Sequence, residues 1–264
     1  MGFMTNATLG VVLISIVAAI IGTYIVTRRM VFISGGITHA CFGGLGLGYF
    51  LGISPMFMAG VFAVAGALGV DWLSSRGARK DSAIAVVWAL GMALGILFIF
   101  LTSGYVPELN TFLFGNVLTI NKSNLLEFGI FAGILILFFS IFYPLIVTVS
   151  FDADFARTRN LPVKWIDLAM TILVAIAIVM IIRLIGIMLL MSLVSLPQMI
   201  AEKFTGRYRN LLFSSIGLSL IGGLGGLWIA YLISVPASAA IVLLLVILYL
   251  LSAAIAPALK NTKS

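Results

Sequence analysis

The sequence has 264 residues, of which 62% are hydrophobic and 9% are charged, and its mean hydropathy is +1.26. Soluble globular domains carry about 25% charged residues, so this composition excludes a water-soluble domain. The formal net charge of +7 is typical of basic loops that orient membrane helices, and no nucleic-acid partner is expected. We therefore predict an all-α polytopic membrane protein embedded in the lipid bilayer.

Nine apolar runs are predicted to be transmembrane helices, at 8–26, 31–52, 56–73, 83–102, 125–149, 165–184, 187–201, 211–232 and 239–258. Most are about 17 to 25 residues long, which is enough to cross a hydrocarbon core of roughly 30 Å. The first run leads directly into more membrane helices, so we expect a retained helix rather than a cleaved signal. The run 187–201 is short, and the helix count falls to eight if it does not span. Pro197 is expected to kink it, with Gln198 and Ser195 supplying polar groups around the freed backbone.

Short polar breaks between these runs set the predicted topology. When alternate breaks are placed on opposite sides, every Lys and Arg except Lys122 and Arg183 falls on one face. Basic residues concentrate in cytoplasmic loops, so this face is predicted to be cytoplasmic, with the N-terminus outside and the C-terminus inside. The segment 103–124 is too polar to span and is expected to be an extracytoplasmic loop or a re-entrant segment. We expect one membrane domain over residues 1–264.

The only histidine of the chain lies in a glycine-rich run. The residues that share its helical face follow a 3-4-3 spacing and are Gly36, His39, Gly43 and Gly46. This spacing predicts that the imidazole lies beside a strip without side chains. Ionisable groups inside membrane segments usually line a pathway, and neutral imidazole is a common ligand of divalent transition metals. A packed helix whose histidine bonds a neighbour is the structural alternative.

Other small residues of the same run point to close packing and to further ligands. A second row at four-residue spacing comprises Ala40, Gly44, Gly48 and Gly52. Small residues at this spacing let membrane helices approach closely. The pair Gly35–Gly36, just before Thr38 and the histidine, is expected to break or kink the helix and expose backbone carbonyls as ligands. The candidate path therefore comprises Gly35, Gly36, Thr38, His39, Gly43 and Gly46.

The predicted cytoplasmic loop 150–164 carries a different signal. Apolar Phe151, Phe155 and Leu161 alternate with charges of both signs, and Trp165 follows. A short interfacial helix in a basic loop has this pattern, and so has a helix that docks into a groove of a partner protein. Asp71 lies near the cytoplasmic end of its run and is expected to be a solvated boundary residue.

Several motifs of enzymes are absent from the sequence. It contains no Gly-x-x-x-x-Gly-Lys-Ser/Thr phosphate loop, so the chain is not expected to hydrolyse ATP by that machinery. It also lacks the His-Glu-x-x-His and Gly-x-Ser-x-Gly motifs of proteases and hydrolases. We therefore predict a chain that is not itself an enzyme.

Five stretches of the sequence together carry a resemblance. In chain order they are RRMVFISGGITHACFGGLGLGYFLG, RKDSAIAVVWALGMALGILF, LNTFLFGNVLTI, SFDADFARTRNLPV and IGIMLLMSLVSLPQMIA. Their order and spacing, from about Arg29 to Leu259, resemble the permease subunits of bacterial ABC importers for zinc, manganese and iron. The second stretch includes the acidic residue, here Asp81, that the family has at the start of a helix.

Two positions depart from the pattern of that family. Its members usually have an aspartate four residues before the histidine, where this sequence has Gly35. The loss of a carboxylate removes a hard, charged oxygen ligand from this helix. The usual glycine of the cytoplasmic loop is replaced by Asn160, which also tolerates left-handed backbone.

The resemblance implies a type II ABC importer-like permease in a bacterial cytoplasmic membrane. Its transported substrate would be a divalent metal ion, and no permanently bound cofactor is implied. The implied partners are a second copy of the permease, two ATP-binding cassette ATPase subunits that carry the ATP, and an extracytoplasmic metal-binding protein. This binding protein would face the segment 103–124.

The same resemblance implies that the loop 150–164 couples the permease to the ATPase. The residues that would dock there are Phe151, Asp152, Phe155, Ala156, Arg157, Asn160 and Leu161. Two alternatives stay open at this point. One is a related permease for a metal chelate or another small solute, and the other is a structural membrane subunit without a transport path.

Overall fold

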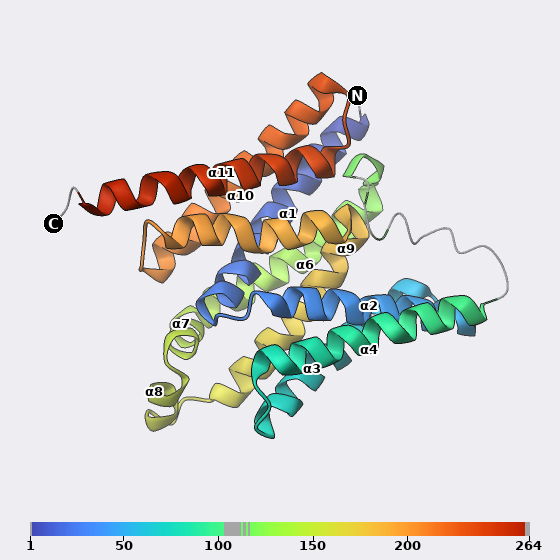
Figure 1. The fold of residues 1–264 in the computed structure, drawn as a ribbon, viewed down its shortest axis with the longest axis horizontal. Helices are drawn as coiled ribbons and strands as arrows, with labels where there is room; N and C mark the ends of the chain where they lie inside the picture. The colour runs from blue at the N-terminus through green and yellow to red at the C-terminus, as the bar shows by residue number, and fades with distance from the viewer. Residues whose placement is uncertain (1, 103–111, 113–114, 116, 262–264) are drawn as a thin grey trace. The chain divides into compact units, whose positions relative to one another are not determined.

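The computed structural model of the chain describes residues 2–102, 112, 115 and 117–261. The regular structure of this described part is helical throughout (Figure 1). The helices are α1 (Gly2–Thr27), α2 (Phe32–Leu51), α3 (Pro55–Ser75), α4 (Lys80–Leu101), η1 (Val117–Thr119), α6 (Lys122–Ile141), α7 (Tyr143–Phe151), α8 (Ala153–Thr158), α9 (Val163–Glu202), α10 (Tyr208–Ile233) and α11 (Ala237–Asn261). The predicted all-α class is confirmed.

Seven of the described helices are long and apolar enough to cross a membrane, namely α1, α3, α4, α6, α9, α10 and α11. The glycine-rich helix α2 is not among them. The prediction of a polytopic membrane protein is confirmed, and the predicted count of nine helices is approximate.

The structure divides two parts of the chain differently from the predicted series of transmembrane helices. The predicted run 125–149 forms α6 and α7, which are separated at Phe142 (φ −97°, ψ 12°). Pro144 lies in the first turn of α7, where the N–H that proline lacks has no intrahelical partner. The predicted runs 165–184 and 187–201 form α9, which is interrupted at Gly186 (φ 75°, ψ 174°). A positive φ of this kind favours glycine, so the sequence permits the interruption at this residue.

The residues of the chain divide by their mutual contacts into two compact units. Unit 1 comprises Met1–Val26, Leu113–Phe138 and Leu184–Ser264, and unit 2 comprises Thr27–Phe112 and Phe139–Arg183. Each unit combines segments that are far apart in the sequence. Unit 2 contains the histidine, the bundle of α2, α3 and α4, and the loop 150–164, and it therefore holds most of the predicted site residues. One membrane domain over residues 1–264 stays a prediction.

In unit 1, Pro197 lies inside the second part of α9 and lacks the N–H that would donate to the Leu193 carbonyl. The Gln198 side chain supplies a donor instead. Its Nε2 donates to the Leu193 carbonyl at 3.3 Å and to the Ala18 carbonyl of α1 at 3.1 Å. Gly22 leaves room for this amide, because a Cβ there would meet it. The predicted role of Gln198 beside the freed backbone is confirmed.

Candidate functional site

His39 lies within α2, and its ring contacts two side chains of α4. Its Nδ1 is 3.0 Å from the Sδ of Met92. The imidazole also stacks on Trp88, with ring centroids 4.3 Å apart and 22° between the ring planes. Trp88 and Met92 are one helical turn apart, so α4 presents both to the same imidazole. The half-buried histidine is thus held between an aromatic face and a thioether.

Few groups near His39 could hold a metal ion. Helix α2 carries no carboxylate, and Gly35, one turn before the histidine, offers no side chain. Among the residues that the structure describes, no group of three or more His, Cys, Asp or Glu side chains could share an ion. Imidazole and thioether suit transition-metal ions better than they suit calcium or magnesium. A pair of such donors would bind an ion loosely, which passage through a membrane requires.

The expected break of α2 at Gly35–Gly36 is wrong. The helix runs without interruption from Phe32 to Leu51. The two glycines lie in its first turns and are buried, with Gly36 packed against Ile84 of α4. The buried hydroxyl of Thr38 donates to the Ser34 carbonyl at 2.6 Å, within the helix. These positions therefore support α2 as a regular helix and do not offer its carbonyls as ligands.

Gly43 and Gly46 contact α4, whereas the sequence predicts open space beside them. A Cβ at Gly43 would lie 3.0 Å from the Gly91 carbonyl, and one at Gly46 would lie 2.6 Å from the Gly95 carbonyl. A Cβ at Gly91 would in turn meet the carbonyl of His39. Glycines on both helices let the two backbones approach closely, so α4 fills the strip that was expected to be clear.

The second row of small residues packs against α3 at its first three positions. A Cβ at Gly44 would meet the Met58 carbonyl, and one at Gly48 would lie 2.6 Å from Pro55 Cα. Ala40 lies against Gly66, where an added Cβ would be 2.8 Å from the Ala40 Cβ. Gly52 differs, because it ends α2 with φ 67° and has nothing within 4 Å of an added Cβ.

Most of the segment 103–124 lies outside the described residues, which here are 112, 115 and 117–124. Within unit 1, Gly115 has φ 60°, and a Cβ on it would meet the backbone of Ile185 and Gly186. This glycine therefore lies directly against the interruption of α9. The predicted extracytoplasmic or re-entrant character of the segment stays a prediction.

The loop 150–164 contains the short helix α8, which is capped at both ends. At the first end, Asp152 Oδ1 accepts a hydrogen bond from the Phe155 N–H at 2.8 Å. At the other end, the Leu161 N–H donates to the Ala156 carbonyl at 3.1 Å, while Asn160 adopts φ 56°. This is the usual left-handed helix ending, normally made with glycine. The prediction that Asn160 tolerates left-handed backbone is confirmed.

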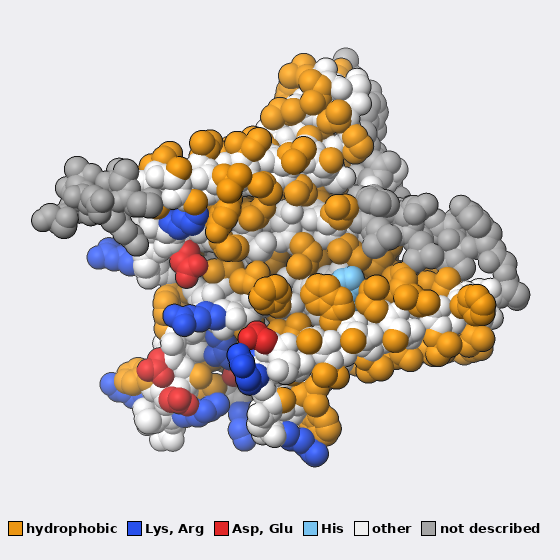
Figure 2. Space-filling view, viewed as in Figure 1, with side chains coloured by type: hydrophobic (Ala, Val, Ile, Leu, Met, Phe, Trp, Pro, Cys, Tyr) orange, Lys and Arg blue, Asp and Glu red, His pale blue; other side chains and the backbone are white. Residues whose placement is uncertain are grey.

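The outer face of α8 combines aromatic and basic side chains. Phe155 is 48% exposed, whereas Ala156 is buried, and Phe151, the last residue of the preceding α7, is 58% exposed. Arg157 pairs with Asp154 at 2.9 Å, and both side chains are largely exposed. Figure 2 shows charged side chains around α8 and around the turn between α3 and α4, while apolar side chains cover the length of α4. Exposed aromatic and arginine side chains are typical anchors of protein–protein interfaces.

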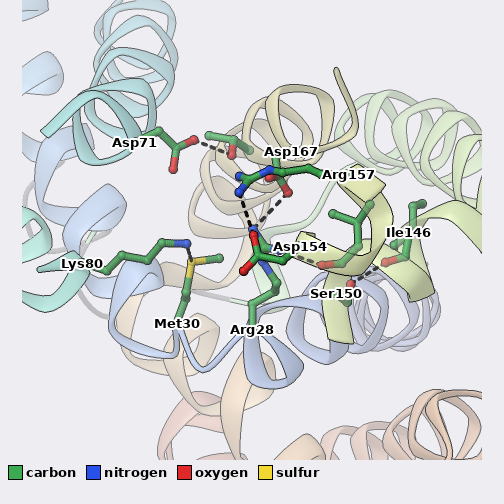
Figure 3. Close-up of polar contacts among 11 residues, drawn as sticks. Arg28, Met30, Asp71, Lys80, Ile146, Ser150, Asp154, Arg157 and Asp167 are labelled. Carbon is green, nitrogen blue, oxygen red and sulfur yellow. Dashed lines mark hydrogen bonds and ion pairs between the residues drawn. The ribbon is translucent and has the colours of Figure 1, made fainter. Parts of the chain in front are cut away.

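Behind α8, unit 2 contains a cluster of charged side chains that the sequence analysis did not predict (Figure 3). Arg28 pairs with Asp167 at 3.0 Å, and both side chains are mostly buried. Asp71, predicted to be solvated, instead accepts a hydrogen bond from Thr171 at 2.9 Å and is only partly exposed. Helical periodicity along the sequence cannot indicate either contact. The hydrogen bond between Asp71 and Thr171 depends on how α3 and α9 pack, and the Arg28–Asp167 pair depends on how the end of α1 meets α9.

Residues 1–256 match the model of the ABC 3 transport family. The chain belongs to the ABC 3 transport family. This ABC 3 chain is 38% identical to an uncharacterized membrane protein of Synechocystis sp., over 96% of the chain and 90% of the relative. It is 34% identical to a probable metal transport system membrane protein of Chlamydia pneumoniae, over 88% and 81%. It is 28% identical to the manganese transport system membrane protein of Listeria innocua, over 97% and 91%.

The fold of the ABC 3 chain matches solved structures. A chain of PsaBC from Streptococcus pneumoniae, in complex with Fab, has a TM-score of 0.83 and 25% identity, covering 96% of this chain and 91% of that one. A putative metal-chelate type ABC transporter in an inward-facing conformation has a TM-score of 0.74 and 17% identity. The second likeness shows the fold alone.

Sequence reasoning missed Trp88 and Met92 as neighbours of the histidine. One signal in the ABC 3 chain could have found them. Gly91 and Gly95 on α4 are four residues apart, as are the small residues of α2, and such rows mark helix contacts. Residues that flank Gly91 are then candidates to touch the histidine of α2.

Proposed function

We propose that this chain is the membrane-spanning subunit of an ATP-driven importer that moves divalent transition-metal ions across the cytoplasmic membrane of a bacterium. Membership of the ABC 3 transport family and the similarity to relatives named for metal and manganese transport support this proposal. The fold likeness to PsaBC is consistent with it. Zinc, manganese and iron are the proposed substrates.

The observation that carries the proposal is the placement of the only histidine. A half-buried imidazole in an apolar helix, in contact with a thioether 3.0 Å away, is a plain candidate for transient contact with a transition metal. We propose His39 as the path residue, with Met92 as its neighbouring donor. Gly35, Gly36, Thr38, Gly43 and Gly46 are proposed to support the path as the packing that holds α2 in place.

The proposed partners are a second copy of the chain, two ATPase subunits that bind ATP, and an extracytoplasmic metal-binding protein. The capped helix α8, with Phe155 and Arg157 exposed, is proposed to dock on the ATPase together with the exposed Phe151 at the end of α7. Its basic surroundings support a cytoplasmic location, with the N-terminus outside and the C-terminus inside.

Uptake of radioactive zinc, manganese and iron tests the proposal, in cells that carry the chain with its ATPase and binding protein. Replacement His39→Ala is expected to abolish uptake while the protein still reaches the membrane, because the imidazole is lost from the path. The matched control is Cys41→Ser, which alters a buried neighbour on the same helix and is expected to leave uptake unchanged. Undiminished uptake by His39→Ala would remove the histidine from the path, and no uptake of any metal by the unaltered assembly would refute metal transport.

A further inference from the structure

The guanidinium of Arg28 joins the two chain segments that flank α8. Arg28 follows α1, and its Nη1 donates to the Val149 carbonyl of α7 at 2.8 Å. Its Nη2 donates to Asp167 Oδ1, in the second turn of α9, at 3.0 Å. Val149 precedes α8 and Asp167 follows it, so one side chain closes the base of the loop that carries α8.

Both contacts use groups that need a partner. The last carbonyls of a helix have no intrahelical donor, and Val149 lies in the last turn of α7, where it is buried. The Arg28 and Asp167 side chains are 13% and 28% exposed, compared with 63% and 89% for the Arg157–Asp154 pair on α8 itself. Solvent screens an ion pair less when the pair is buried. The Arg28–Asp167 pair is therefore expected to be more stable than the Arg157–Asp154 pair.

A second contact continues from the base of the loop to the bundle that contains His39. Thr171 lies one turn after Asp167 on α9, and its hydroxyl donates to Asp71 of α3 at 2.9 Å. Helix α3 packs against α2. At the start of α4, the Lys80 Nζ is 3.3 Å from the Sδ of Met30, which lies between α1 and α2. Figure 3 shows the side chains of Arg28 and Asp167 directed at each other, with Asp71 and Lys80 reaching in from α3 and α4.

We infer that Arg28 is a positioning residue for coupling, which makes α7, α8 and the start of α9 move as one body. The inference rests on the proposed function, because it takes α8 as the ATPase docking helix. A displacement of α8 by the ATPase then reaches α9 through Asp167 and reaches α3 through Thr171 and Asp71. Without Arg28, α8 moves while α9 and the bundle of α2, α3 and α4 stay behind.

The test compares ATP hydrolysis with metal uptake in the complete assembly, co-expressed with its ATPase and binding protein. In Arg28→Gln, the ATPase is expected to copurify and to hydrolyse ATP as in the unaltered assembly, while manganese uptake per ATP falls about tenfold, within the range typical of coupling between sites. Arg28→Lys keeps the charge but cannot bridge both acceptors, so manganese uptake per ATP is expected to fall in this variant as well. The exposed neighbour Arg29→Gln removes the same charge and is expected to change neither quantity.

Uptake per ATP separates coupling from a merely structural role, because a chain that folds poorly would lose ATPase copurification and ATP hydrolysis together with uptake. Unchanged uptake per ATP in both Arg28→Gln and Arg28→Lys would overturn the inference, and so would a loss of ATPase copurification in both variants. Failure of the proposed function gives a different result. In that case the unaltered chain would retain no ATPase, or Phe155→Ala would retain as much as the unaltered chain.

Discussion

Gly91 is the glycine at which the contact between α2 and α4 leaves least room beside the backbone of the other helix. Its Cα faces the backbone of His39 and Ala40, and an added Cβ would meet the His39 carbonyl. A carbonyl in a helix cannot move aside as the end of a flexible side chain can. The position of the histidine relative to Trp88 and Met92 therefore depends on a residue that carries no functional group.

Replacement Gly91→Ala is expected to destabilise the protein by about 1–3 kcal/mol, because overpacking forces the two helix backbones apart. Thermal unfolding of the purified protein in detergent measures this as a lower Tm. The matched control is Gly60→Ala on α3, where nothing lies within 4 Å of an added Cβ. It is expected to leave the Tm unchanged or slightly raised, since alanine favours helix over glycine. Equal Tm values for the two variants would show that the α2–α4 contact adjusts freely.

Helix α9 is the element in which local sequence and tertiary contacts are most closely linked. Its interruption is at Gly186, where the backbone is non-helical, and Gly115 lies against that point. At Pro197 the helix continues, because the amide of Gln198 donates to the carbonyl that proline leaves without its N–H. A proline inside a membrane helix is tolerated when a neighbouring side chain satisfies the freed carbonyl.

A double-mutant cycle tests this compensation. Gln198→Leu is expected to cost about 1–3 kcal/mol of stability, since it leaves the buried Leu193 carbonyl without a donor. In a Pro197→Ala background the new N–H at residue 197 can donate to that carbonyl, so the same change is expected to cost at least about 0.5 kcal/mol less. Unfolding of the four proteins gives the difference.

The control for this cycle is Ser195→Ala. In the unaltered chain the Ser195 hydroxyl donates to the Met191 carbonyl. Its effect is expected to be the same in both backgrounds, because that carbonyl is not the one freed by Pro197. Additive effects of Gln198→Leu and Pro197→Ala would contradict the assigned role of the amide.

At the scale of the whole molecule, the chain returns twice to unit 1 and once to unit 2. Unit 2 takes in 27–112 and then 139–183, so its bundle and the loop that carries α8 come from separate parts of the sequence. The basic residues of the turns set the proposed orientation, in which the α3–α4 turn and α8 are cytoplasmic.

Thiol labelling tests the orientation in a Cys41→Ser background, where no other cysteine remains. A cysteine at Ser75, an exposed residue at the end of α3, is expected to react with an impermeant reagent only from the cytoplasmic side. A cysteine at Ser54, exposed before α3, is the matched control and is expected to react from outside. Labelling of Ser75→Cys in intact cells would reverse the proposed topology.

Much of the fold follows from the sequence because it depends on local chemistry. Composition determines that the chain is a helical membrane protein, since a bilayer of fixed thickness requires apolar runs of a fixed length. Backbone preference likewise determines the left-handed turn at Asn160 and allows the interruption at Gly186. Rows of glycine predict close packing, and Gly44 and Gly48 do lie against another helix.

Tertiary structure alone decided which helix each face meets. The spacing around His39 is the same whether its strip of glycines faces a path or another helix. The structure shows that Ile84, Gly91 and Gly95 of α4 pack against this strip. Met92 lies 53 residues from His39, and Asp167 lies 139 residues from Arg28. Helical periodicity fixes the direction of a side chain relative to its own axis, but it carries no information about the partner. Those pairings form only when the helices pack. They produce the contact between His39 and Met92 and the contacts by which Arg28 closes the base of the loop that carries α8.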